Sequence, residues 1–281
     1  MLTVPPKTFL DTQIISDVER GAISSSDWER AKSYLREATR YCISPLTVGE
    51  LLAALTNGGE EYFDKHQRRL RLLLAPGPPS EVFDFIRYFY ARELGLNIQR
   101  PPHLEDDFLN VIALILAAPS KAALLDGFTH PKNSQQTVKI RIDRFIEENQ
   151  QLKRPYIDSL EQLKKLGKIR ISPDEWAANL LRFSGVVDPN DLTKRKIAEN
   201  LFAAYEFEMV VLDLVRNRNF SIEKNISDQV DGQQLYYLCD PNTVFITNDS
   251  DFKNRIKGAQ AKRIKTLAEL LDCAEEKSLL L

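Results

Sequence analysis

The sequence predicts an α/β protein whose short parallel sheet, covered by helices, is interrupted by a large all-helical insertion. Short β-rich segments alternate with helical segments at both ends of the chain, over residues 1–58 and 226–281. This order is typical of parallel sheets. Between the two ends, residues 59–225 are rich in Leu, Lys, Glu, Arg and Ala at helical spacing, and they show no convincing strand. We therefore expect an α/β core in two parts, 1–58 and 226–281, with 59–225 as the insertion.

The first part of the core reads as strand, helix, strand, helix. Residues 7–11 form a short apolar strand that ends on an acidic residue, and a loop is expected to follow it. Ser26, with Glu29 three residues later, has the spacing of a capping box and marks the start of a helix. Residues 41–44 predict a second strand, and a helix is expected over 47–55.

After the insertion the α/β pattern returns. Residues 226–239 predict a helix, and 243–247 (TVFIT) predict a strand that leads directly into Asp249. Residues 263–265 are expected to add an edge strand, and Thr266 is expected to cap the last helix. Within the insertion the spacing of apolar residues predicts helices over 60–74, 80–94, 105–118, 134–166, 172–183 and 191–216.

Composition narrows the classes of site. The formal net charge is −2, so any site for a polyanion must be a local basic patch. Three widely separated cysteines and three scattered histidines argue against a disulfide framework and against a zinc site. The N-terminus shows no signal-peptide pattern, and no apolar run approaches the roughly 20 residues that span a bilayer. We therefore expect a soluble, cytoplasmic protein with no membrane partner.

Four acidic residues stand beside the ends of the predicted strands. Asp11 ends the first strand, and Glu50 lies one turn into the helix after the second. Asp231 is on the helix before the third strand, and Asp249 follows that strand. Because ligands of open parallel sheets bind at the carboxyl ends of the strands, these side chains are expected to approach one another there.

Such a set of carboxylates has a chemical consequence. Converging carboxylates repel one another unless a cation compensates, and oxygen ligands without His or Cys select Mg²⁺ or Mn²⁺. These ions support hydrolysis of phosphodiesters. Each residue also has a plain structural alternative: Asp11 as a turn cap, Glu50 as a solvated helix residue, and Asp249 as a helix N-cap.

Three segments resemble the PIN-domain nucleases of the VapC-like type. FLDTQIISDV is similar to the family's opening strand with its Asp-Thr pair, and ISPLTVGELL is similar to the motif that bears the Glu. DGQQLYYLCDPNTVFITNDSDF resembles the Asp-led helix and the strand that closes on Thr-x-Asp. The resemblance implies a three-layer α/β/α fold, although compact members lack an insertion as long as 59–225.

The resemblance also implies roles for individual residues. Asp11, Glu50, Asp231 and Asp249 would be the catalytic carboxylates and the ligands of Mg²⁺ or Mn²⁺. Asp228, one turn before Asp231 on the same helix face, competes for the third position, and Asp231 is preferred because its distance to Asp249 suits the family's helix and strand. The further assignments are Asp251 as an accessory carboxylate and Thr12 and Thr247 as hydroxyls near the phosphate.

Basic residues follow the proposed site directly. Residues 253–265 contain six Lys or Arg and no acidic residue, so they could neutralise the phosphates beside the scissile bond. Lys253, Arg255 and Lys257 are the candidates for these phosphate contacts. A solvated surface run is an equally good interpretation of the same strip.

The functional prediction is a metal-dependent endoribonuclease that hydrolyses RNA, with a role as the toxin of a toxin–antitoxin pair as one form of it. In that form a protein inhibitor would be a partner, and homo-oligomers stay open. Two alternatives also stay open: a DNA nuclease of related fold, and a PIN-like scaffold that binds RNA or a protein without cutting.

Overall fold

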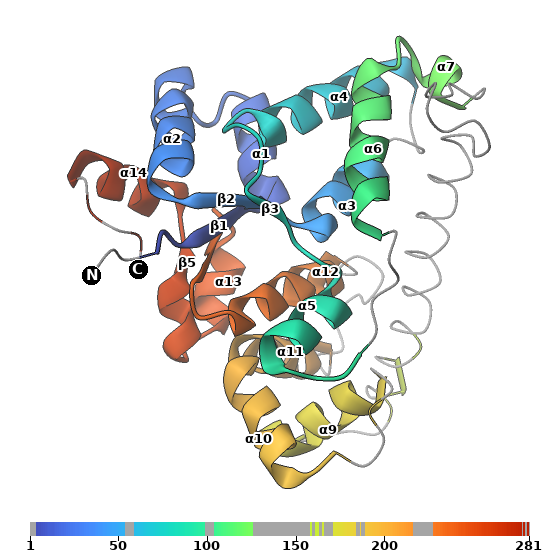
Figure 1. Ribbon diagram of the computed structural model, residues 1–281, viewed down its shortest axis with the longest axis vertical. Helices are drawn as coiled ribbons and strands as arrows, with labels where there is room; N and C mark the ends of the chain where they lie inside the picture. Colours follow the sequence, from blue (N-terminus) through green and yellow to red (C-terminus); the bar gives the residue numbers. More distant parts are fainter. Residues whose placement is uncertain are drawn as a thin grey trace.

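Five parallel strands form one sheet with helices on both faces (Figure 1). The computed structural model describes residues 4–53, 59–98, 104–125, 171–183, 189–215 and 227–276, with residues 158, 161, 162, 165, 186, 278 and 280 besides. The strand order is β3-β2-β1-β4-β5, so the α/β class is confirmed. The strands are β1 (Lys7–Leu10), β2 (Arg40–Ile43), β3 (Glu81–Val82), β4 (Thr243–Ile246) and β5 (Ile264–Lys265).

Helices account for most of the remaining described residues. Within these residues no helix is both long and apolar enough to cross a membrane. The helices are α1 (Thr12–Glu19), α2 (Ser25–Ala38), α3 (Pro45–Ala53), α4 (Glu60–Leu74), α5 (Ile86–Leu94), α6 (Leu104–Ala117), α7 (Lys121–Leu125), α9 (Pro173–Phe183), α10 (Asp191–Asn200), α11 (Phe202–Val215), α12 (Ser227–Gln234), η3 (Leu235–Cys239), α13 (Ser250–Arg255), η4 (Ala259–Arg263) and α14 (Leu267–Glu276).

The central strand β1 brings the two ends of the chain together. It pairs with β2 on one side and with β4 on the other, with Leu10 opposite Ile246. Because all pairs are parallel, the strands end at one edge of the sheet, where Asp11, Ser44 and Thr247 directly follow β1, β2 and β4. We call this the carboxyl edge, and the opposite edge, where the strands begin, the starting edge.

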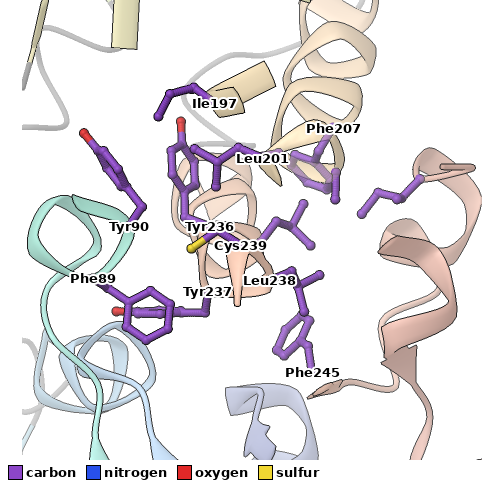
Figure 2. Close-up of a cluster of buried hydrophobic side chains, with 14 of the residues drawn as sticks. Phe89, Tyr90, Ile197, Leu201, Phe207, Tyr236, Tyr237, Leu238, Cys239 and Phe245 are labelled. Carbon is purple, nitrogen blue, oxygen red and sulfur yellow. The ribbon is translucent and has the colours of Figure 1, made fainter. Parts of the chain in front are cut away.

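Strand alternation divides the buried side chains between two cores. In β1, Phe9 and Leu10 point to opposite faces, as do Phe245 and Ile246 in β4. Leu10 joins a core with α1, α2, α4, α6 and α14, whereas Phe9 joins a core with α5, α9, α10, α11 and η3. Figure 2 shows the second core around η3, where the rings of Phe89 and Tyr237 meet edge to face with centroids 4.9 Å apart.

The segment 59–225 supplies side chains to both cores. Phe63 of α4 and Ile115 of α6 are buried in the first core, and Trp176 of α9 and Phe207 of α11 in the second. The prediction that this segment is all-helical is wrong, because β3 lies inside it and pairs with β2 at the edge of the sheet. A strand of two residues is too short to show the alternation by which strands are recognised in a sequence.

Two predictions about helix starts are also wrong. A helix, α1, begins directly after the first strand, where a loop was expected. The helix α2 is capped by Ser24, whose side chain accepts a hydrogen bond from the backbone N–H of Asp27 at 3.1 Å, and not by Ser26. Three consecutive serines offer several cap spacings, and only the structure selects among them.

The prediction for the last helix is confirmed. Thr266 caps α14, because its hydroxyl accepts from the backbone N–H of Glu269 while Glu269 accepts from the N–H of Thr266. The helix expected over 226–239 is α12 followed by the 3₁₀ helix η3. Most of the helix expected over 134–166 lies outside the described residues.

Candidate functional site

The carboxyl edge brings residues from both ends of the chain into contact. The backbone N–H of Asp11 donates to the carbonyl of Ile246 at 2.9 Å, which extends the β1–β4 ladder by one residue. Thr247 and Asp249, which follow β4, are thereby placed next to Asp11. The expected meeting of Asp11 with the Asp249 segment is confirmed.

Asp11 is a buried carboxylate with two threonine hydroxyls beside it. It is 5% exposed, and its Oδ2 accepts a hydrogen bond from Thr247 Oγ1 at 2.6 Å. Thr12 Oγ1 lies 3.3 Å from its Oδ1. Burial raises the pKa of Asp11, the bond from Thr247 opposes this, and the neighbouring Asp249 raises it further. The position favours a positive charge beside Asp11.

Glu50 is brought to the same site by Thr12. The Thr12 hydroxyl is 2.7 Å from Glu50 Oε2 and 3.3 Å from Asp11 Oδ1. Since a hydroxyl donates one hydrogen, the shorter distance assigns it to Glu50. The Asp-Thr pair thus places a carboxylate of α3 beside the carboxylate that follows β1, over 38 residues of sequence.

Asp249 combines two of the roles considered for it. It is the N-cap of α13, where its Oδ1 accepts from the backbone N–H of Asp251 at 2.8 Å. Its backbone N–H donates to Thr247 Oγ1 at 3.0 Å, which fixes it beside Asp11. The N-cap contact uses one carboxylate oxygen of Asp249. The charge of Asp249 still raises the pKa of Asp11.

Asp251, the expected accessory carboxylate, forms an ion pair on α13. Its Oδ2 lies 2.5 Å from a guanidinium nitrogen of Arg255, one turn later on α13. An arginine on a carboxylate competes with a metal ion for the same lone pairs. In this structure one carboxylate oxygen of Asp251 is engaged by Arg255, and its accessory metal role stays a prediction.

The helix α12 carries Asp231 next to α3. It contacts α3, and Gln234, three residues after Asp231, hydrogen-bonds to Ser44 and Thr47 at the start of α3. Asp231 is partly buried. The side chain of Asp228 lies outside the described residues, so the choice between these two aspartates stays a prediction.

The carboxylates do not form a closed metal cage in this structure. Among the described residues no three Asp, Glu, His or Cys side chains lie close enough to hold an ion together. The nearest arrangement is Asp11 with Asp249 and, through Thr12, Glu50. Its donors are all hard oxygens, which fit Mg²⁺ or Mn²⁺ and not a softer metal. Carboxylates without a cation repel one another, so an open arrangement is the expected one.

The basic strip is largely engaged in other contacts. Lys253 is paired with Glu269 on α14, and Arg255 is paired with Asp251 and lies over the ring of Phe207 at 4.9 Å. The exposed side chain of Lys257 forms no ion pair with the described residues. Of the three residues expected to contact phosphate, Lys257 is thus the one whose side chain forms no ion pair within the described part of the chain, while its backbone N–H donates to Glu206.

The two threonines expected near the phosphate hold carboxylates in the structure. Thr247 is 1% exposed and donates to Asp11, and Thr12 donates to Glu50. Both hydroxyl hydrogens are thereby used inside the protein. Their role is to orient the acids, and the expectation of direct phosphate contact has no support in this geometry.

Two residues at this edge were not singled out from the sequence. Lys265 ends β5 beside Ile246, and its carbonyl accepts from the N–H of Thr247 at 2.9 Å, which places it at the carboxyl edge. Asn248 donates to Asp17 and accepts from the N–H of Leu267, both at 3.2 Å, so it fixes the loop between Thr247 and Asp249. The expected edge strand over 263–265 was the available signal for Lys265.

A separate surface hollow of about 690 Å³ lies between α9 and α10. Its lining mixes acidic and basic side chains and includes none of the carboxylates of the carboxyl edge. Charges of both signs, some of them already paired, favour no single class of ligand. The lining residues are Ile171, Asp174, Glu175, Ala178, Asn179, Arg182, Asp191, Lys194 and Arg195.

Comparisons of the chain with protein-family models, with curated proteins and with solved structures give no match.

Proposed function

We propose that this chain is a Mg²⁺- or Mn²⁺-dependent endoribonuclease built on a PIN-like α/β core. The observation that carries the proposal is that Asp11 lies beside Asp249 at the carboxyl edge and is linked to Glu50 through the Thr12 hydroxyl. Ligand sites of open parallel sheets lie at this edge. The order of the motifs along the chain supports the PIN-like assignment.

In this proposal, binding of the metal ion and orientation of its ligands are roles of different residues. Asp11, Glu50 and Asp249 would hold the ion, with Asp231 approaching from α12. Thr247 and Thr12 orient two of these carboxylates through hydrogen bonds of 2.6 and 2.7 Å. A bound divalent ion would supply an activated water and neutralise charge on the phosphodiester.

A cleavage assay on the full chain tests the proposal. Single-stranded RNA and DNA of one sequence are incubated with the protein and Mg²⁺, Mn²⁺ or EDTA. Cleavage products are expected from RNA, and only in the reactions that contain Mg²⁺ or Mn²⁺. Asp11→Asn keeps the shape and the acceptor for Thr247 but removes the charge. It should lower the rate by on the order of a hundredfold or more, the scale of losing one charge-stabilising group.

The matched control is Asp251→Asn. Its carboxylate is bound by Arg255, so this variant should keep activity within a few-fold of wild type. An Asp11→Asn enzyme as active as Asp251→Asn would remove the proposal, and cleavage of DNA alone would make the chain a DNA nuclease.

A non-catalytic scaffold is the second candidate, favoured by the absence of a three-carboxylate group among the described residues. In that case RNA would bind without being cut, and divalent ions would not stabilise the fold. An ion that binds only the folded state should stabilise it by about 2.7 kcal/mol at a hundredfold excess over its dissociation constant. Thermal melts with Mn²⁺ and with EDTA separate the two candidates.

A further inference from the structure

Gln234 is a buried amide at the junction of α12 and α3. Its side chain is 1% exposed. Its Oε1 accepts a hydrogen bond from Ser44 Oγ at 3.0 Å, and its Nε2 lies 3.3 Å from Thr47 Oγ1. Both ends of the amide are therefore bonded at the start of α3, to Ser44 just before the helix and to Thr47 in its first turn, across more than 180 residues of sequence.

The bonds continue from Gln234 to the central strand. Thr47 Oγ1 donates to the carbonyl of Leu10 at 2.9 Å, and Leu10 is the last residue of β1. The amide thus ties together α12, α3 and β1. Each of these elements carries one acid close to the contact: Asp231 lies three residues before Gln234, Glu50 three after Thr47, and Asp11 directly after Leu10.

Two other buried hydroxyls of the sheet differ from those of this hydrogen-bond network. Thr8 and Thr243 are fully buried, and their hydroxyls have no hydrogen-bond partner among the described residues. At the carboxyl edge, by contrast, the hydroxyls of Ser44, Thr47 and Thr247 are all bonded. A fully bonded polar network in a core fixes one relative position of its elements, which apolar packing does less strictly.

We infer that Gln234 is a positioning residue of the acidic site: it sets the spacing between the helices that bear Asp231 and Glu50 and thereby the affinity for a divalent cation. This inference rests on the proposed metal-dependent function. Gln234 itself contacts no reacting group. Residues that orient metal ligands from outside typically contribute roughly 10–100-fold to metal affinity.

The test is Gln234→Met in the full chain, titrated with Mn²⁺ alone. Met has a similar length and is apolar, so it fills the space and makes neither hydrogen bond. We expect the concentration of Mn²⁺ for half-maximal stabilisation, and for half-maximal cleavage, to rise by roughly 10–100-fold. At saturating Mn²⁺ the cleavage rate should return to within a few-fold of wild type, because the ligands themselves are intact.

Two further variants keep the test decisive. Thr47→Val removes the opposite end of the same network at nearly constant volume and should reproduce the shift in Mn²⁺ dependence, including where Gln234→Met does not fold. Thr243→Val removes a buried hydroxyl without a partner at the starting edge, and its Mn²⁺ dependence should equal that of wild type.

The inference would be overturned if folded Gln234→Met had the same Mn²⁺ dependence as wild type, even with a lower melting temperature. If Gln234→Met does not fold, the same outcome in Thr47→Val would overturn it. A purely structural role predicts that result. A wild-type chain that neither binds Mn²⁺ nor cleaves would instead remove the proposed function and the inference with it, so the two failures are distinguishable.

Discussion

At the starting edge of the sheet the buried charges are paired, whereas at the carboxyl edge Asp11 accepts a hydrogen bond from the hydroxyl of Thr247. Lys7, the first residue of β1, lies 3.2 Å from Glu81 and 3.1 Å from Asp240. Arg92 adds a second cation to Glu81 at 3.0 Å. Although burial lowers the pKa of Lys7, its two carboxylate partners raise it above the ordinary value.

Asp11 and Asp249 at the carboxyl edge differ from these paired acids. Within the described residues Asp11 and Asp249 form no ion pair, and the charge of Asp249 raises the pKa of Asp11. The same chain can pair buried acids with lysine and arginine only four residues away along β1. In the part of the chain that the structure describes, Asp11 and Asp249 at the carboxyl edge are not ion-paired, whereas Glu81 and Asp240 at the starting edge are paired with Lys7. This difference supports the proposal that a divalent cation binds at the carboxyl edge.

The largest predicted effect is on stability at the starting edge. Lys7→Met leaves the buried Asp240 without its cation, so the free energy of unfolding should fall by about 3 kcal/mol. The control is Lys32→Met, which breaks an exposed pair with Glu29 and should cost less than about 1 kcal/mol. Urea unfolding of both variants measures the difference. Mn²⁺ should stabilise Lys7→Met as much as it stabilises wild type. Loss of this stabilisation would show that the two edges do not act independently.

A buried histidine, His66, differs from the acids at both edges of the sheet. His66 on α4 is 3% exposed, and within the part of the chain that the structure describes its Nδ1 has no hydrogen-bond partner. Burial, with the charges of Arg69 and Lys65, lowers its pKa to about 4 from the usual 6.5. The unfolded chain therefore binds this proton at a higher pH than the folded chain does.

Stability should accordingly fall as the pH drops from 6.5 towards 4. The contribution of His66 between pH 7 and pH 5 is roughly 2 kcal/mol. His66→Leu removes the titrating group, so its unfolding free energy should depend less on pH over this interval. Parallel slopes for wild type and His66→Leu would contradict the expectation.

A smaller effect of opposite sign is predicted at the carboxyl edge. Asp249→Asn keeps the cap of α13 but relieves the repulsion on Asp11, so it should raise stability in EDTA by on the order of 1 kcal/mol. It should also lose most of the stabilisation by Mn²⁺. Asp240→Asn at the starting edge is the comparison, and it should lower stability in EDTA. Destabilisation by both variants would show that the two edges do not differ.

The smallest predicted effect concerns RNA binding by Lys265. If this side chain contacts a phosphate at the carboxyl edge, Lys265→Ala should weaken binding a few-fold and reduce the slope of log affinity against log salt by about 1. Lys253→Ala is the control, since its ammonium is paired with Glu269. Equal salt slopes for the two variants would show that Lys265 contacts no phosphate of the RNA.

Local pattern and chain order were enough to predict much of this molecule. The apolar runs before Asp11 and before Asp249 predicted β1 and β4, and the alternation of strand and helix predicted that the sheet is parallel. In a parallel sheet these two facts place both acids at one edge. The edge strand at β5 and the cap at Thr266 followed from equally local signals.

The tertiary structure decided what depends on contacts between distant residues. The bonds of Thr12 with Glu50, of Thr247 with Asp11 and of Gln234 with Ser44 join positions 38, 236 and 190 residues apart, and no local spacing rule extends so far. It also decided which charges are already used. Arg255 and Lys253 look equivalent to Lys257 in the sequence, but folding places a carboxylate against two of the three. A side chain's partner is fixed by packing, whereas its type and its place on a strand or helix are fixed by sequence.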